Sequence, residues 1–349
     1  MTLPQNSENE IVSISASQIR DEFGPTTESG EKVSLGEYRI DENYGELTER
    51  PLDDGIPQSG KISFQHFRGK KLNIIIDYYT SGYADNTREN EGETLNIRDR
   101  FTGGTGVHVV GGFKSKPASS SEIKTIVHVN RKLGGEKAND ATRCALRTGT
   151  GWEADTEMII DVGNEGRIYG AGGNGGQGGD VDTSGHAGQS GTSGLGIQIS
   201  NVKVNIAGGA IIRAGFGGGG GGGAGRQNDK GSERTVGGGG GGGGQGFPAG
   251  SGGSEGDADH GQSAGTAGSL NESGEGGGGG NNGNQAYSGA GGEGGQNGEN
   301  ANNGSGGNHG AGEGAGNGAA IRRTSGINVT INKTSGAEVV GSQSATGVS

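Results

Sequence analysis

The sequence is short of the residues that usually hold a protein together. Of its 349 residues one is cysteine, Cys144, and six are proline, while hydrophobic residues make up 27% and aromatic residues 4%. A single cysteine excludes an intrachain disulfide framework. The apolar supply lies well below the roughly 45–50% of ordinary soluble domains, too low for two conventional cores over this length. We therefore do not expect a full-length globular enzyme.

Basic clusters and long apolar runs are missing as well. The formal net charge is -12, and an acidic chain without basic clusters offers no electrostatic footprint for nucleic acid. No uninterrupted apolar run of about 18 residues occurs, so we expect no membrane span. The first residues, MTLPQNSENE, contain neither a basic nor an apolar stretch, so no secretory signal peptide is expected.

Motifs that carry catalysis or bind cofactors are not found either. The six histidines are far apart and lack metal-ligand spacing, and no phosphate-binding loop of the form G-x-x-x-x-G-K-[ST] occurs. Asp257 and Asp259 alternate as calcium ligands do, but the acidic residue at the twelfth loop position is missing. We expect no enzyme, no cofactor and no metal site.

Glycine is abundant and unevenly placed. Of the 85 glycines, 18 lie in residues 1–162, 63 in residues 163–319 and 4 in the last 30 residues. Every third position is glycine in 8 of 9 cases from Gly170 to Gly194, and in 8 of 10 from Gly289 to Gly316. This period is that of a polyproline-II helix, and the chain has too little proline for collagen. We predict a polyglycine-II bundle with backbone hydrogen bonds between neighbouring helices, the alternative being a disordered linker.

Short β-strands are expected around the glycine-rich region. The runs at 71–82, 104–113 and 123–133 have the apolar character or alternation of strands. A further pattern, with small or apolar residues at +6, +8 and +10, occurs three times. Its copies are Ile160/Gly166/Ile168/Gly170, Val204/Ala210/Ile212/Ala214 and Ile331/Ala337/Val339/Gly341. Such self-similarity is typical of stacked coils or hairpins.

The predicted fold is thus mostly β and polyproline-II, with little α-helix. It comprises an N-terminal attachment segment at 1–75, a small β-domain at 76–162, a glycine-rich polyglycine-II bundle with exposed loops at 163–319, and a C-terminal β repeat at 320–349.

The N-terminal segment contains two short units that suit docking onto a larger assembly, or a small independent domain. In the first, Ile14, Ile19 and Phe23 fit one short helix opened by Ser15 or Ser17. The second unit carries Ile62, Phe64 and Phe67. We expect these six apolar residues to serve attachment.

The patterns SASQIRDEFG, VSLGEYR and PQSGKISFQHFRGKK resemble a leader in tail-fibre and tail-tip proteins of tailed bacteriophages, with a departure at His66-Phe67-Arg68. YGAGGNGGQGG and GINVTINKTSGAEVVG look like segments of glycine-rich phage tail proteins, similar in kind to polyglycine-II receptor-binding adhesins. The resemblance implies a virion tail component that joins other tail proteins through its N-terminal segment and contacts a host surface receptor. A homotrimer is one assembly that it allows.

Loops on a rigid scaffold are where binding residues tend to lie. The expected receptor contacts are Phe216, Arg226, Asp229, Phe247, Asp257, His260, Asn281 and Tyr287. One alternative is a structural spacer or assembly protein without receptor contact, and a second is an ice-binding protein. Loop substitutions that alter host range would favour the adhesin over the spacer. An ice-binding protein requires a flat face of small residues, against which the charged loops 226–236 and 254–263 argue.

Overall fold

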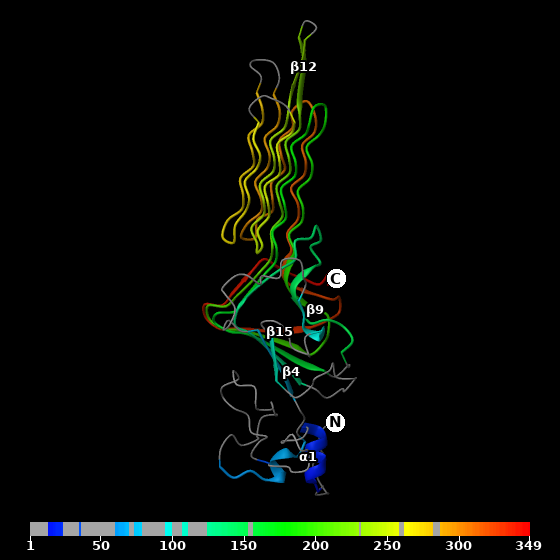
Figure 1. The fold of residues 1–349 in the computed structure, drawn as a ribbon, viewed down its shortest axis with the longest axis vertical. Helices are drawn as coiled ribbons and strands as arrows, with labels where there is room; N and C mark the ends of the chain where they lie inside the picture. The colour runs from blue at the N-terminus through cyan, green and yellow to red at the C-terminus, as the bar shows by residue number, and fades with distance from the viewer. Residues whose placement is uncertain are drawn as a thin grey trace.

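Parallel β-strands stack in the middle of the molecule, and a group of extended segments rises from them (Figure 1). The computed structural model describes residues 13–23, 35, 60–69, 73–78, 95–99, 107–110, 124–152, 156–229, 232–257, 262–281 and 287–349. Among these, α1 (Ala16–Phe23) is the one α-helix, which confirms a mostly β chain with little helix. None of the described helices is long and apolar enough to cross a membrane.

Three sheets form the middle of the molecule. The first contains, in spatial order, β15 (Val329–Lys333), β10 (Val202–Ile206), β7 (Glu157–Val162), β4 (Lys124–Val129), β1 (Asn73–Tyr78) and β3 (Val107–Val110). The second contains β16 (Glu338–Val340), β11 (Ile211–Arg213), β8 (Arg167–Tyr169) and β5 (Lys132–Gly134). The third contains β17 (Ser342–Ser344), β14 (Ala319–Arg323), β9 (Ser193–Ile197), β6 (Cys144–Arg147) and β2 (Leu95–Asn96). Every pairing in them is parallel except that of β1 with β3.

The chain winds through the three sheets in a fixed order, so the strands form a three-sided coil. Four turns follow one another: β4–β5–β6, β7–β8–β9, β10–β11–β14 and β15–β16–β17. Each strand lies in register with the equivalent strand of the next turn. Inward-facing apolar side chains of all three sheets then meet in one core, which includes Val127, Ile160, Val204, Leu195 and Ile321.

The repeat in the sequence corresponds to the stacking of this coil. Val204 pairs with Ile160 on one side and with Ile331 on the other, and Ile212 pairs in the same way with Ile168 and Val339. Of the two architectures that the repeat allowed, stacked coils are correct. The turn β4–β5 belongs to the same series but does not share the spacing of the repeat, because its corner is shorter and Leu133 follows Val127 by six residues instead of eight.

The linear division into four segments does not match these sheets. Strands from 76–162 and from 320–349 lie in the same sheets as β8 to β11, which fall within the predicted glycine-rich segment. The predicted boundaries at 162/163 and 319/320 are therefore wrong as limits of separate units. A coil is continuous across them because each of its turns needs the next one to cover its strand edges.

Two long excursions leave the coil at one corner, between the second and third sheets. Residues 170–191 follow β8 and residues 214–318 follow β11; together we call them the sheaf. Gly170 lies at this corner, where a Cβ atom would overlap the carbonyl oxygen of Thr192 and the amide of Gly215. A residue without a side chain is required because two backbones pass each other here.

Backbone hydrogen bonds between extended segments hold the sheaf together. Every third amide of 173–179 donates to a carbonyl of 216–222, and every third amide of 172–178 to a carbonyl of 248–254, at 2.8–2.9 Å. Three residues per turn is the period of polyproline II, so this pattern supports the polyglycine-II geometry, which itself stays a prediction. These bonds replace an apolar core in a region that has few apolar residues.

Side-chain oxygens complete the bonding at the edge of the sheaf. Along 263–269, a hydroxyl group at every third position accepts a hydrogen bond from a backbone amide of the adjacent segment. The pairs are Ser263 with Gly278 (2.8 Å), Thr266 with Glu275 (2.7 Å) and Ser269 with Glu272 (2.9 Å). Many Ser, Thr and Asn residues of this surface are therefore occupied in holding the scaffold.

Candidate functional site

A β-hairpin forms the far end of the sheaf. β12 (Gly225–Asp229) pairs antiparallel with β13 (Ser232–Val236), and the hairpin projects beyond the other segments at the end opposite to α1 (Figure 1). It continues the long segments that begin at 214 and return from 237. The hairpin therefore rests on the most enclosed part of the sheaf, since residues 214–224 and 237–246 are all buried.

The tight turn after residue 179 lies beside the base of this hairpin. Asp182 has a left-handed backbone (φ 63°), and Thr183 N donates to the Asp180 carbonyl (2.9 Å). Aspartate is among the few non-glycine residues that tolerate this conformation. Ala224 N donates to the carbonyl of Thr183 (3.2 Å), so the turn is bonded directly to the chain that enters the hairpin.

Asp182 is the common partner of Arg226 and His309, which come from two other segments. Its Oδ2 lies 2.6 Å from Arg226 Nη1, and its Oδ1 lies 3.5 Å from His309 Nε2. The backbone reinforces this cluster, because Arg226 N donates to Asn308 Oδ1 (2.8 Å) and His309 N donates to the carbonyl of Ala224 (3.1 Å). Three separate loops are thereby fixed against one another.

Two of the three exposed large hydrophobic side chains found among the described residues lie at this end. Val181 is 43% and Tyr287 54% exposed, and the third, Phe64, belongs to the N-terminal segment. Tyr287 closes a loop through a bridge to Asn281, and Asp257, also exposed, donates its amide to Asp180 Oδ1 (2.8 Å). The predicted contacts Arg226, Asp257, Asn281 and Tyr287 thus lie together at the far end.

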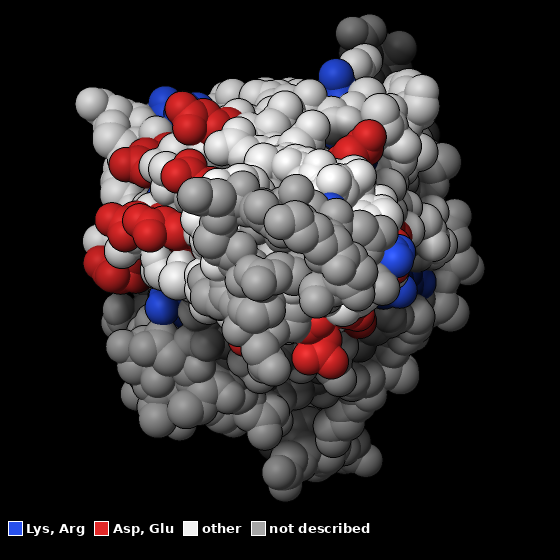
Figure 2. All heavy atoms as spheres, turned by 90° about the horizontal axis from the view of Figure 1, so that it is seen from above, with Lys and Arg blue, Asp and Glu red and all other residues white. Residues whose placement is uncertain are grey.

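The sheaf carries its charges unevenly. Its only Lys and Arg residues are Arg226, Lys230 and Arg234, and all three belong to the hairpin region. Eight exposed carboxylates among the described residues lie elsewhere on it: Asp182, Glu255, Asp257, Glu272, Glu275, Glu293, Glu299 and Glu313. Seen from above the hairpin, acidic side chains gather along one flank (Figure 2). The sequence already holds this signal, since residues 237–318 contain no Lys or Arg.

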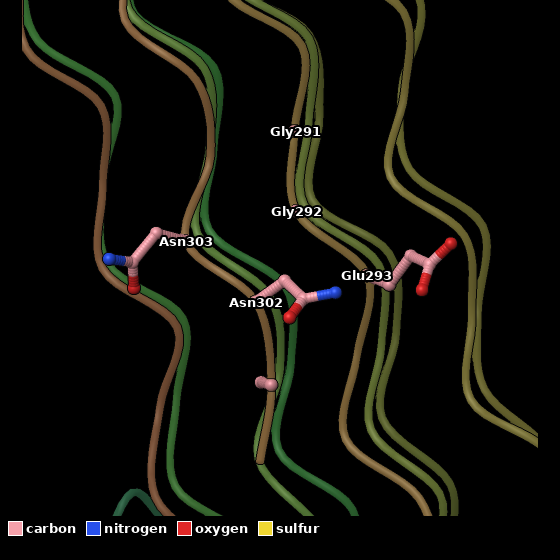
Figure 3. A pocket seen from close by; sticks show the side chains of 6 residues that line it. Gly291, Gly292, Glu293, Asn302 and Asn303 are labelled. Atoms are coloured by element: carbon pink, nitrogen blue, oxygen red, sulfur yellow. The ribbon is translucent and has the colours of Figure 1, made fainter. Parts of the chain in front are cut away.

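A shallow groove runs along the side of the sheaf. Gly291, Gly292, Glu293, Ala301, Asn302 and Asn303 line it. The side chains of Asn302 and Asn303 stand on one segment and that of Glu293 on the neighbouring segment (Figure 3). Asn303 is occupied, because its Oδ1 accepts a hydrogen bond from Gly314 N (2.8 Å). The groove is therefore mainly a seam between segments.

Two of the predicted receptor contacts are placed elsewhere by the structure. Phe216 is fully buried, so its prediction as a contact is wrong; glycine neighbours leave room for one ring inside the sheaf. Phe247 lies at the coil end of the sheaf, in the turn 245–249, away from the other predicted contacts, and its role as a receptor contact stays a prediction. Both predictions rest on the expectation that loops on a rigid scaffold carry the binding residues, which does not distinguish a packed ring from a displayed one.

Phe247 instead joins the sheaf to the coil. Its ring packs edge-to-face on Tyr169 at 6.2 Å between centroids, and Lys132 Nζ lies 4.6 Å above it. Arg213 stacks on the other aromatic ring, with 5.4 Å from Cζ to the Tyr169 centroid. These partners come from β5, β8 and β11 of the second sheet, so this cluster, the elbow, spans three turns of the coil.

The remaining distal predictions are not described at the side-chain level. His260 lies outside the described residues, and for Asp229 only the backbone, as the last residue of β12, is described. Both stay predictions.

The N-terminal units form the local structures that their patterns indicate. Ser15 opens α1: Gln18 N donates to Ser15 Oγ (3.2 Å), and Ser15 N donates to Gln18 Oε1 (2.8 Å). This is a capping box. Ile19 is fully buried and Ile14 half-buried, and the side chain of Phe23 lies outside the described set.

The second unit contains the short 3₁₀ helix η2 (Phe64–Phe67). Ser63 precedes it and donates its amide to His66 Nδ1 (2.9 Å), so the unusual histidine serves as a cap. Phe67 is fully buried, Ile62 is half-buried and Phe64 is 41% exposed. One phenylalanine thus packs inside while its neighbour remains on the surface. The attachment role of these residues stays a prediction.

Three groups in the coil have shifted pKa values. Hydrogen bonds from the Thr142 side chain and backbone lower the pKa of Asp140. Burial raises the pKa of the Cys144 thiol to about 12 and also raises the pKa of Tyr169. A thiol held neutral in this way is unreactive, so Cys144 is a packing residue.

A rigid, glycine-rich scaffold that displays loops at one end defines a class of binding protein. Residues 86–347 match the family described as phage tail fibre adhesin Gp38, so the chain belongs to that family. It is therefore a component of the phage virion tail with a role in host recognition and attachment, and the resemblance to phage tail proteins is confirmed.

One solved structure with a similar chain is described as the crystal structure of the gp37-gp38 adhesin tip complex of the bacteriophage S16 long tail fiber. The identity is 18%, with a TM-score of 0.34 over 83% of this chain and 90% of the other. No curated protein matches.

Proposed function

We propose that the far end of the sheaf is the surface through which this adhesin contacts the host receptor. The carrying observation is the placement of Val181 and Tyr287, two large exposed apolar side chains beside the projecting hairpin. Exposed apolar groups cost free energy in water and are typical of binding surfaces. Tyrosine also offers a wide contact face at a small cost in side-chain entropy.

The rigidity of the scaffold favours tight contact. The Asp182 cluster orders three loops before any partner arrives, which lowers the entropy that binding must overcome. The surface contains a hydroxyl, amides and charges of both signs around the apolar groups. It suits recognition by shape and hydrogen bonds, and we propose that no bond chemistry is involved.

The N-terminal residues 1–75 are proposed to join this chain to other tail fibre proteins. Two capped units with buried Ile19 and Phe67 give the segment local order. Exposed Phe64 supplies an apolar group for a partner. A homotrimer remains an assembly to be tested by mass measurement in solution.

The test compares adsorption of the full-length protein to host cells before and after changes at the far end. The combined variant Val181→Ser and Tyr287→Ser removes the apolar contacts, whereas Ala267→Ser changes an exposed residue at the coil end of the sheaf. We expect at least a tenfold loss of affinity for the first variant and none for the control. Thermal unfolding establishes that both variants are folded.

Binding that survives the double substitution unchanged would contradict the proposed surface. Absence of any binding by the folded wild-type chain, across a panel of hosts, would favour the structural spacer. Inhibition of ice recrystallisation by the purified chain would instead favour the ice-binding alternative.

A further inference from the structure

The sheaf contains several asparagines that are followed by glycine. In such a pair the backbone nitrogen of the glycine can attack the asparagine side chain with little steric hindrance, and asparagine is among the thermolabile residues for this reason. The chain has five pairs: Asn174–Gly175, Asn282–Gly283, Asn297–Gly298, Asn303–Gly304 and Asn317–Gly318. All except Asn282–Gly283 lie within the described residues. The reaction needs two groups that are free to move, namely the side-chain amide and the N–H group of the glycine.

In three of the four described pairs, hydrogen bonds hold both groups. The glycine amides donate to backbone carbonyls at 2.8–3.0 Å: Gly175 to Ser251, Gly304 to Gly312 and Gly318 to Gly215. The side-chain oxygens accept from backbone amides at 2.8–3.0 Å: Asn174 from Ser251, Asn303 from Gly314 and Asn317 from Gly217. These pairs are part of the bonding between segments, so the reaction there first requires two hydrogen bonds to break.

The pair Asn297–Gly298 is arranged differently. Both residues are exposed in a tight turn, with left-handed φ angles of 44° and 95°, and Glu299 N donates to the Gln296 carbonyl across it (2.7 Å). Within the part of the chain that the structure describes, neither the Asn297 side chain nor the Gly298 amide has a hydrogen-bond partner. A Cβ atom at Gly298 would meet nothing within 4 Å, so the space around the turn is open.

We propose that Asn297 is a site of spontaneous deamidation, with the nucleophile supplied by the chain itself. When the turn opens, rotation of the Asn297 backbone brings the Gly298 nitrogen to Asn297 Cγ, which the conformational freedom of glycine facilitates. The nitrogen loses its proton to solvent and bonds to Cγ, while the Cγ–Nδ2 bond breaks and the leaving nitrogen takes a proton from solvent as ammonia. Water then adds to either carbonyl of the cyclic imide, which gives aspartate or isoaspartate. One water is consumed, one ammonia is released, and nothing is oxidised or reduced.

The modified residue lies against the buried side chain of Gln245. Gln245 Oε1 accepts a hydrogen bond from Asn297 N (2.9 Å), and its Nε2 donates to the Leu270 carbonyl (3.1 Å). One fully buried side chain thus joins two turns at the coil end of the sheaf. Aspartate adds only an exposed charge, whereas isoaspartate lengthens the main chain by one carbon and displaces the amide from Gln245. A buried oxygen left without its donor destabilises the fold, so isoaspartate loosens this end of the sheaf.

The test incubates the full-length protein at mildly alkaline pH and measures aspartate and isoaspartate at each pair by peptide mapping with mass spectrometry. The same incubation in guanidinium chloride gives the rate of each pair in the unfolded chain. We expect folding to slow the reaction at Asn174, Asn303 and Asn317 at least about tenfold more than at Asn297, because their groups must first lose hydrogen bonds. Each pair is compared with itself, so differences between neighbouring side chains cancel.

Asn297→Gly provides the control, since it keeps the left-handed φ accessible and has no side chain to react. Incubation should lower the unfolding temperature of wild type more than that of this variant. Equal slowing at all four described pairs would overturn the proposal, as would the absence of conversion at Asn297 in the folded protein. An equal fall in unfolding temperature for both proteins would overturn the loosening at Gln245. If the variant does not fold, the rates in wild type still decide whether Asn297 is the site.

Discussion

Arg226 Nη1 and Asp182 Oδ2 lie 2.6 Å apart across two excursions that leave the coil on different turns. Asp182 belongs to the shorter excursion, 170–191, and Arg226 to the hairpin of the longer one, 214–318. The ion pair therefore fixes the displayed hairpin to a part of the sheaf that enters and leaves the coil independently. Because both side chains are more than a third exposed, the pair contributes to local order more than to global stability.

Substitutions at Asp182 separate the effect of its charge from the effect of its left-handed backbone conformation. Asp182→Gly keeps the left-handed φ accessible and removes only the carboxylate, whereas Asp182→Ala also places a less tolerant residue at φ 63°. We expect faster amide exchange in 225–236 for both, and a lower unfolding temperature mainly for the alanine variant. Hydrogen exchange followed by mass spectrometry measures the first effect. Equal protection of the hairpin in wild type and the glycine variant would show that the ion pair does not order it.

Because backbones lie in close contact inside the sheaf, we expect the free energy of unfolding to depend strongly on the glycines there. A Cβ atom at Gly241 would overlap the carbonyl oxygen of Gly219, while one at Gly316 meets nothing within 4 Å. Gly241→Ala should lower the free energy of unfolding by about 1–3 kcal/mol or more, as overpacking does. Gly316→Ala should change it by less than about 1 kcal/mol, and reduced freedom of the unfolded chain favours stabilisation.

Chemical denaturation of both variants beside wild type provides the measurement. Similar small effects at the two positions would mean that the segments can separate without cost. That result would contradict the close packing of the sheaf.

The sequence predicted the local elements better than it predicted which of them lie side by side in the fold. The spacing from Ile160 to Gly170 recurs because equivalent residues stack in the coil, so the repeat was visible without the structure. The insertion of the sheaf at one corner was not, since strand pairing between residues as distant as Val204 and Ile331 leaves no local signal. The glycine period likewise indicated extended segments with a three-residue repeat, but it did not indicate which segments are neighbours.

The site was predicted in part for a similar reason. Arg226 of the hairpin and Tyr287 both lie between glycine runs, where the long segments of the sheaf end. Phe216 and Phe247 also interrupt glycine runs. The ring of Phe216 is buried inside the sheaf, whereas the ring of Phe247 packs on Tyr169 and Lys132 of the coil. Composition cannot distinguish these cases, because burial depends on which segments lie side by side.

Phe247 offers a test of the elbow between the coil and the sheaf. Phe247→Ala removes the ring that packs on Tyr169 and under Lys132, and should lower the free energy of unfolding by about 1–3 kcal/mol. The loss is below that of a fully buried ring because Phe247 is half-exposed. Phe247→Leu keeps apolar volume but loses the ring contacts, so it should fall between alanine and wild type.

Thermal unfolding and amide exchange at 134–135 and 170–172 report on this contact, since Gly135 N donates to the Phe247 carbonyl and Phe247 N to that of Gly170. Because the elbow is distant from the hairpin, receptor binding by the folded variant should be retained. Loss of host binding without loss of stability would show that Phe247 is part of the contact surface.

The hydrogen bonds of the Asp140 carboxylate lead us to expect that folding stability depends on pH. Asp140 lies at the corner where the C-terminus meets the coil. Its Oδ1 accepts hydrogen bonds from the Thr142 hydroxyl (2.6 Å) and amide (2.8 Å), and the Thr142 hydroxyl oxygen lies within hydrogen-bond distance of Ser349 Oγ (2.7 Å). These bonds favour the carboxylate and lower its pKa from 3.8 in the folded state. A group with a lowered folded pKa stabilises above its unfolded pKa and loses that contribution as the pH falls through the folded value.

Asp140→Asn should therefore be slightly less stable than wild type at neutral pH, and the difference should shrink below about pH 4. Thr142→Val removes the hydroxyl that lowers the pKa most, so it should reduce the acid dependence without abolishing it. Unfolding temperatures of the three proteins between neutral pH and about pH 2 provide the comparison. A difference between wild type and Asp140→Asn that stays constant over this range would show that the carboxylate charge does not act at this corner.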